Sequence, residues 1–96
     1  PRRPTTCTFT VLGRSGSKLW TRGSAPAACT RLRDRVDVYG VNDGALLLRI
    51  PGVSFELRPG RPRTSKVPPA CWRLSKGAKP DYFALEVTLD APSCER

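Results

Sequence analysis

The sequence contains no histidine, which is the residue that most often supplies a general base, a proton shuttle or a metal ligand near neutral pH. No two cysteines form the close pair that is typical of zinc sites. The longest aliphatic run covers residues 45–48, whereas a membrane-spanning helix needs about 18 consecutive apolar residues. No nucleophile has an identifiable orienting partner. The sequence therefore predicts no enzyme, no bound metal or cofactor, and no transmembrane segment.

Positive charge, by contrast, is abundant. The 96 residues include 17 Lys and Arg against 8 Asp and Glu, which gives a net charge of +9 at pH 7. Residues 1–48 contain 8 basic and 3 acidic residues, and residues 49–96 contain 9 and 5, so the charge belongs to the folded body rather than to a tail. A surface of this sign favours an acidic partner. Arg outnumbers Lys 13 to 4, as a GC-rich gene would produce, which leaves open a charge without a binding role.

The four cysteines predict two disulfides and an oxidising compartment, because separated cysteines in even number are typical of short secreted domains. Two pairings carry weight: Cys7–Cys29 with Cys71–Cys94, or Cys7–Cys94 with Cys29–Cys71. Loop-closure entropy gives about 3.4 kcal/mol for each loop of the first pairing, against about 4.0 and 4.6 kcal/mol for the second, and does not decide between them. Residues 7–29 and 71–94 have a faintly similar order of apolar stretches around a basic turn, and this likeness favours the first pairing. Since the chain begins at Pro1, we expect a removed leader or a domain excised from a longer protein.

Alternating apolar and polar residues predict seven short β-strands separated by turns. Ten prolines and eight glycines leave no room for a long helix. We expect one domain over residues 1–96, with an N-terminal extension at 1–6. Its fold class is an all-β, disulfide-stapled antiparallel β-sandwich, immunoglobulin-like or related, and a small β-barrel is the alternative. The predicted strands cover residues 7–12, 18–21, 31–41, 45–50, 53–58, 71–74 and 82–89.

Aromatic residues are few, and most fall on inward registers. Trp20 and Trp72 are expected in the core, and only Tyr39 and Tyr82 are expected to point outward. Because nucleic-acid modules place aromatic side chains beside basic ones on one sheet face, this pattern disfavours base stacking. Trp20 follows Cys7 by 13 residues, a spacing that resembles the core of an immunoglobulin domain, although no Tyr-x-Cys motif closes the pattern.

Two groups of basic residues form the candidate binding surface. The first group, Arg31, Arg33 and Arg35, would project from one face of the strand at 31–41, at intervals of about 6.6 Å. Such a row suits a sulfated or phosphorylated polymer, and the alternative is a solvated face that protects an edge strand. The second group lies in or beside a Pro- and Arg-rich loop expected at 59–69, and a further basic turn is expected at 75–81. The predicted binding residues are Arg31, Arg33, Arg35, Arg58, Arg61, Arg63 and Lys66.

The basic loop allows two further interpretations. The segment 58–63 resembles an AT-hook, of whose core Gly60, Arg61 and Pro62 are present, and this resemblance implies a nucleic-acid-binding domain. Residues 62–64 would instead serve a protease inhibitor as its exposed loop.

The function expected first is that of a non-catalytic extracellular binding module, either a secreted factor or a piece of a receptor or adhesion ectodomain. Its basic surface would engage a glycosaminoglycan or an acidic protein surface. The alternatives are a small secreted effector or protease inhibitor, and a basic nucleic-acid-binding domain. The chain is accordingly expected to be secreted or to form the extracellular part of a membrane protein.

Overall fold

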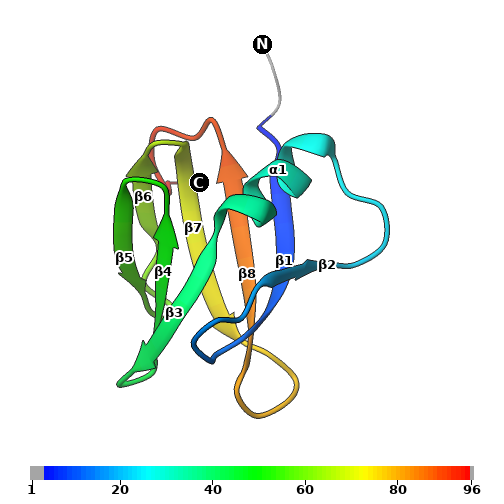
Figure 1. The fold of residues 1–96 in the computed structure, drawn as a ribbon. Coiled ribbons are helices and arrows are strands. Elements are labelled where there is room, and N and C mark those ends of the chain that lie inside the picture. The colour runs from blue at the N-terminus through cyan, green and yellow to red at the C-terminus, as the bar shows by residue number, and fades with distance from the viewer. Residues whose placement is uncertain (1–3, 96) are drawn as a thin grey trace.

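The computed structural model describes residues 4–95, in which two antiparallel β-sheets are joined by one short helix (Figure 1). The larger sheet has the strand order β2-β1-β8-β7-β6, and the smaller has the order β3-β4-β5. The arrangement is sandwich-like, and the predicted all-β, disulfide-stapled fold is confirmed. The elements are β1 (Thr6–Leu12), β2 (Leu19–Thr21), α1 (Ala27–Arg35), β3 (Asp37–Asn42), β4 (Ala45–Ile50), β5 (Val53–Leu57), β6 (Arg63–Lys66), β7 (Pro69–Lys76) and β8 (Tyr82–Leu89).

Alternate residues of the strands form the core, as the period of two predicts. Trp72 on β7 is fully buried, and its ring meets Phe55 of β5 edge-on with centroids 5.1 Å apart. Such aromatic pairs contribute about 0.5–1.5 kcal/mol beyond their buried area. The indole Nε1 of Trp72 donates a hydrogen bond to Ser65 Oγ at 2.8 Å, which satisfies its polar atom inside the core. The largest fully buried side chains include Trp72, Phe9, Leu19, Leu46, Leu48, Ile50, Leu57 and Leu85.

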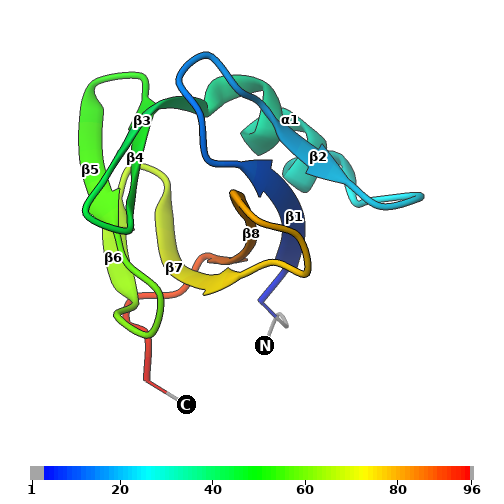
Figure 2. The same cartoon turned by 90° about the horizontal axis from the view of Figure 1, so that it is seen from below.

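The two sheets curve around the core (Figure 2), and hydrogen bonds connect them on both sides, through the β1–β2 turn and β3 on one side and through β6 and β5 on the other. On one side, Gly16 N donates to Val38 O at 2.8 Å and Val38 N donates to Ser17 O at 3.2 Å. On the other side, Arg63 Nη1 of β6 donates to Glu56 O of β5 at 3.0 Å. These bonds occupy backbone groups that an open sheet edge would otherwise expose.

Helix α1 corrects one prediction, because residues 31–35, its second half, were expected to begin the strand at 31–41. Cys29 and Leu32 lie three residues apart on one helix face, and both are buried. Leu32 and Val36 lie four residues apart, a spacing that fits a helix as well as an alternating strand, so alternation alone did not separate the two. From Asp37 onward the predicted strand is present as β3.

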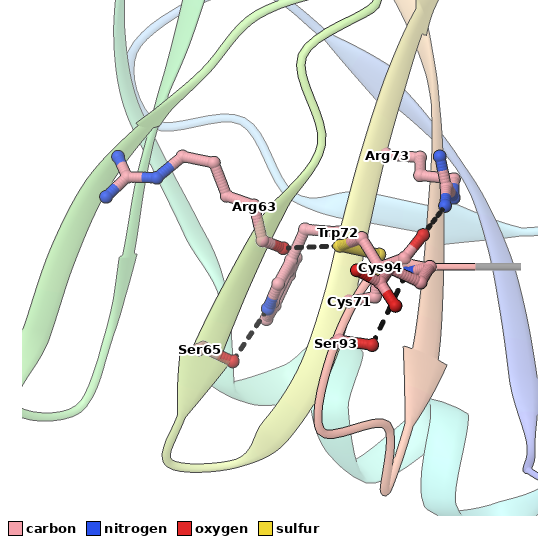
Figure 3. Close-up of a disulfide and its surroundings, with 8 residues drawn as sticks. Arg63, Ser65, Cys71, Trp72, Arg73, Ser93 and Cys94 are labelled. Atoms are coloured by element: carbon pink, nitrogen blue, oxygen red, sulfur yellow. Dashed lines mark hydrogen bonds between the residues drawn. A yellow bond between two sulfur atoms is a disulfide. The ribbon is translucent and has the colours of Figure 1, made fainter.

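The two disulfides join cysteines that are neighbours along the chain. Cys7 bonds to Cys29 with Cα atoms 5.5 Å apart, and Cys71 bonds to Cys94 with Cα atoms 5.1 Å apart. Of the two pairings that the sequence left open, the structure has Cys7–Cys29 with Cys71–Cys94. The first bond ties α1 to β1, and the second ties the C-terminal segment to β7, where Arg73 also donates a hydrogen bond to Cys94 O (Figure 3).

The expected loop at 59–69 is shorter than predicted, because β6 forms within it and pairs with β7. The prolines of this region flank β6 rather than interrupt it, so the strand keeps its backbone donors. At the other end of the chain, β1 begins at Thr6, inside the expected extension 1–6. Residues 1–3 of that extension lie outside the described residues.

The prediction that Trp20 lies in the core is wrong, since its side chain is 47% exposed. Trp20 pairs with Thr10 on the outer face of the larger sheet, and Leu19 supplies the buried side chain of β2. The core tryptophan is Trp72, so the immunoglobulin-like spacing of Trp20 has no counterpart in the packing. Val53, expected to point inward, is also exposed.

Candidate anion-binding groove

The end of the sandwich farthest from α1 carries the turns that connect β3 to β4, β5 to β6 and β7 to β8 (Figure 1). Gly60 N donates to Leu74 O at 3.3 Å, which holds the β5–β6 turn against β7. Gly60 has a φ of 76°, a left-handed conformation that glycine adopts without strain. Arg61 N donates to Arg58 O at 3.1 Å and closes the turn. The two arginines of this turn are thereby placed beside the last residues of β7.

The β7–β8 turn brings two lysines to the same end. Gly77 N donates to Tyr82 O at 2.8 Å, and a Cβ atom on Gly77 would lie only 2.9 Å from that oxygen. Glycine is therefore required for the two strands to approach here. Tyr82 N donates to Lys79 O at 3.2 Å. This compact turn fixes Lys76 just before it and Lys79 within it.

Two adjoining shallow hollows lie among these turns. The first, of about 530 Å³, is lined by the β3–β4 and β5–β6 turns together with Lys76. The second, of about 460 Å³, shares Gly44 and Lys76 with the first and continues along the β7–β8 turn as far as Tyr82. We call the joined hollows the basic groove. Its basic residues are Arg58, Arg61, Lys76 and Lys79.

The cations of the basic groove differ in how they are engaged. Arg58 donates to Asp43 O at 2.8 Å, and its Nη2 lies 3.6 Å from Glu56 Oε2, so this side chain helps to fix the turns. The side chains of Arg61, Lys76 and Lys79 are exposed and make no ion pair or hydrogen bond with any residue in 4–95. The acidic residues that line the groove are Asp43 and Asp81. Four cations against two carboxylates give the groove a net positive charge, which attracts anions.

The predicted row of three arginines on one strand face is wrong, because all three lie on α1. Arg31 and Arg35 are one helical turn apart and exposed, and they line a separate hollow of about 290 Å³ with Asp90 and the β6–β7 turn. Arg33 is half-buried, and it donates to Thr21 Oγ1 at 3.4 Å and to Asp34 Oδ1 at 3.2 Å. Arg31 and Arg35 therefore form a small basic pair at the α1 end, away from the basic groove.

The basic residues of the predicted loop also lie in different parts of the surface. Arg63 faces β5, where it donates to Glu56 O and lies 5.9 Å from the centroid of the Phe55 ring. Figure 3 shows its side chain extending away from Trp72 and the disulfide. Lys66 is exposed at the far end of β6, opposite Pro69. Of the loop group, the basic groove includes Arg58 and Arg61 alone.

The segment that resembles an AT-hook is a closed turn rather than an extended peptide, since it begins with the Arg58–Arg61 turn and ends where Arg63 enters β6. Lys76 and Lys79 were missed as binding residues. Their turn was predicted to be basic, but nothing in the sequence shows that the turn at 58–61 lies against the end of β7, just before the turn at 77–81. That contact depends on β7 lying beside β6 and on the bond from Gly60 to Leu74.

Among residues 4–95, no three Asp, Glu, Cys or His side chains are grouped as they would be to hold a metal ion. Nothing helical in the same range has the length and hydrophobicity that crossing a bilayer requires. No protein family, curated protein or solved structure matches this chain. The basic groove and its surroundings are therefore the basis for assigning a function.

Proposed function

We propose that this protein is a non-catalytic extracellular binding module whose basic groove engages a sulfated polysaccharide of the glycosaminoglycan type. The observation that carries the proposal is the set of three exposed cations, Arg61, Lys76 and Lys79, which have no partner among the described residues and line one groove. The guanidinium group of Arg61 offers two parallel donors to a sulfate, and the lysines act as point charges on the neighbouring sulfates.

The shape and the disulfides favour this ligand over other anions. The groove is shallow and extends over two hollows, which suits a chain-like ligand better than a small molecule that needs burial on most sides. Two disulfides favour an oxidising compartment, and sulfated polysaccharides are extracellular polymers. An acidic protein surface would use the same charges and is the second partner class to examine.

A charge-matched pair of variants tests the proposal. The groove variant is Arg61→Ala, Lys76→Ala, Lys79→Ala, and the control variant is Arg31→Ala, Arg35→Ala, Lys66→Ala, which removes three exposed cations elsewhere. Each exposed cation is worth about 0.5–1 kcal/mol, so the groove variant should lose about ten- to a hundredfold in heparin affinity by calorimetry. The control variant should lose less than threefold, although both elute equally early from a cation exchanger.

Three results would contradict the proposal. Equal losses in the two variants would show that net charge alone attracts heparin. Elution of the native protein from heparin no later than a cation exchanger of matched charge density predicts would show that no specific site exists. Stronger binding to an acidic polypeptide than to heparin, again lost in the groove variant alone, would show that the groove binds an acidic protein surface rather than a sulfated polysaccharide.

A further inference from the structure

The basic groove adjoins an aromatic pair on the outer face of the larger sheet. Trp20 lies on the edge strand β2 and pairs with Thr10, whereas Tyr82 begins β8. The two ring centroids are 6.3 Å apart with their planes inclined by 33°. Tyr82 is half-buried, but the Trp20 side chain is 47% exposed, and no other described aromatic residue is as exposed. Tryptophan and tyrosine are enriched at binding interfaces, because their rings combine an apolar face with a polar group.

Tyr82 connects this aromatic pair to the cations. It lines the second hollow of the basic groove together with Lys76 and Lys79, and Lys76 also lines the first hollow with Arg61. Tyr82 therefore contacts the Trp20 ring and also borders the groove that leads past the two lysines to the β5–β6 turn. Apolar ring surface lies at one end of this path, and along the rest the cations outnumber the two carboxylates, Asp43 and Asp81.

Sulfated saccharides present the complementary groups in alternation. A pyranose ring has a face of C–H groups that are slightly positive, and the face of an indole ring is negative, so the two stack. Sulfates on the neighbouring sugars carry the charge that the lysines and Arg61 would meet. We infer that Trp20 is a sugar-stacking platform, and that the occupant of the groove is a sulfated oligosaccharide that stacks one ring on Trp20 and places its sulfates along Lys79, Lys76 and Arg61. This inference rests on the proposed function and adds the recognition of the sugar ring to that of the sulfate.

A single-stranded nucleic acid also combines stacking rings with charged groups. The saccharide is favoured because both disulfides indicate an oxidising compartment. A thymidine oligonucleotide therefore serves as the competing ligand in the test.

The two tryptophans allow a direct measurement, because Trp72 is fully buried and Trp20 is exposed. Acrylamide, a neutral quencher, will report chiefly on Trp20. A saturating heparin-derived octasaccharide should lower the quenching constant of the native protein at least threefold. The Trp20→Phe variant retains Trp72 alone, so its weak quenching should not change when the octasaccharide binds.

Affinity measurements separate stacking from charge. Trp20→Ala should weaken octasaccharide binding about tenfold, and it should change binding of polyvinyl sulfonate, a polyanion without sugar rings, less than twofold. Trp20→Phe should recover most of the octasaccharide affinity because it keeps an aromatic face. The control variant is Val67→Ala, which removes a side chain that is 60% exposed on the β6–β7 turn and should affect neither ligand. Near-UV circular dichroism confirms that each variant is folded.

The outcomes distinguish this inference from the proposed function. If the octasaccharide binds in the groove but neither protects Trp20 nor responds to Trp20→Ala, the inference is wrong and the proposed function stands. If neither polyanion binds specifically, the proposed function and the inference both fail. If the thymidine oligonucleotide binds more tightly than the octasaccharide at the same salt concentration and protects Trp20, the saccharide assignment is overturned.

Discussion

The two ends of strand β8 have different surroundings. At its C-terminal end, Val87 pairs with Cys7 and Thr88 pairs with Cys71, so both disulfides and α1 gather there. At its N-terminal end, Tyr82 meets turns that are held by backbone hydrogen bonds and by the side chain of Arg58, without a disulfide. Covalent bonds fix one end of the sandwich, and the other end presents short turns with exposed cations.

This difference separates stability from recognition. Arginines occur at both ends, but near α1 and along β6 several of them serve the fold: Arg33 bonds to Thr21, Arg63 to Glu56 and Arg73 to Cys94. In the basic groove, three of four cations have no such partner among residues 4–95. The number of positive charges therefore does not by itself identify a binding surface, because many of these charges serve the fold.

The largest effect on the free energy of unfolding is expected when both disulfides are reduced. Each disulfide closes a loop of similar length and contributes about 3.4 kcal/mol to the free energy of unfolding, so reduction of both should remove about 7 kcal/mol. Because that is comparable to the whole stability of a small domain, the reduced protein should be largely unfolded at 37 °C. Urea unfolding with and without a phosphine reductant, followed by near-UV circular dichroism, measures the difference. A reduced protein that keeps its near-UV spectrum and more than half of its stability would break the comparison.

A smaller effect is expected for a polar contact in the core near the α1 end. Ser65→Ala removes the acceptor of the buried Trp72 Nε1 and the hydroxyl that donates to Pro68 O. An unsatisfied buried donor costs about 1–3 kcal/mol, and the free energy of unfolding should fall by that amount. The control is Ser75→Ala, an exposed serine toward the groove end of β7, which should change it by less than about 0.5 kcal/mol. Equal effects at both positions would show that the two ends do not differ in this respect.

Much of the fold could be predicted from the sequence, because the alternation that marks a strand involves residues close together in the chain. Strands β4 and β8 occupy the predicted residues, and the inward positions of β1 follow the predicted alternation. Where two periodicities fit the same residues, as at Leu32 and Val36, the choice between helix and strand depended on tertiary packing. Trp20 was misplaced for a related reason, since the sequence does not show which face of an edge strand is covered.

Only half of the cations of the basic groove were predicted from the sequence. Arg58 and Arg61 were predicted, and Lys76 and Lys79 were not, because the groove exists only where turns from different parts of the chain meet. Conversely, the prediction included Arg33 and Arg63, whose internal hydrogen bonds depend on long-range pairings of the sheets. Arginines that hold the fold and arginines that are left exposed have the same sequence pattern, and the sequence alone does not separate them.

The smallest expected effect concerns the one ion pair that links the β1–β2 turn to β3, between Lys18 and Asp37. Both side chains are more than half exposed, so the pair should contribute about 0.2–1 kcal/mol, measured as the coupling energy in a double-mutant cycle of Lys18→Ala and Asp37→Ala. The coupling should vanish in 1 M salt, where the Debye length is about 3 Å. The turn should keep its place without the pair, because the bonds of Gly16 and Ser17 to Val38 hold it through the backbone. A coupling well above 1 kcal/mol that persists in high salt would show that side-chain charge, rather than the backbone bonds to Val38, holds this turn.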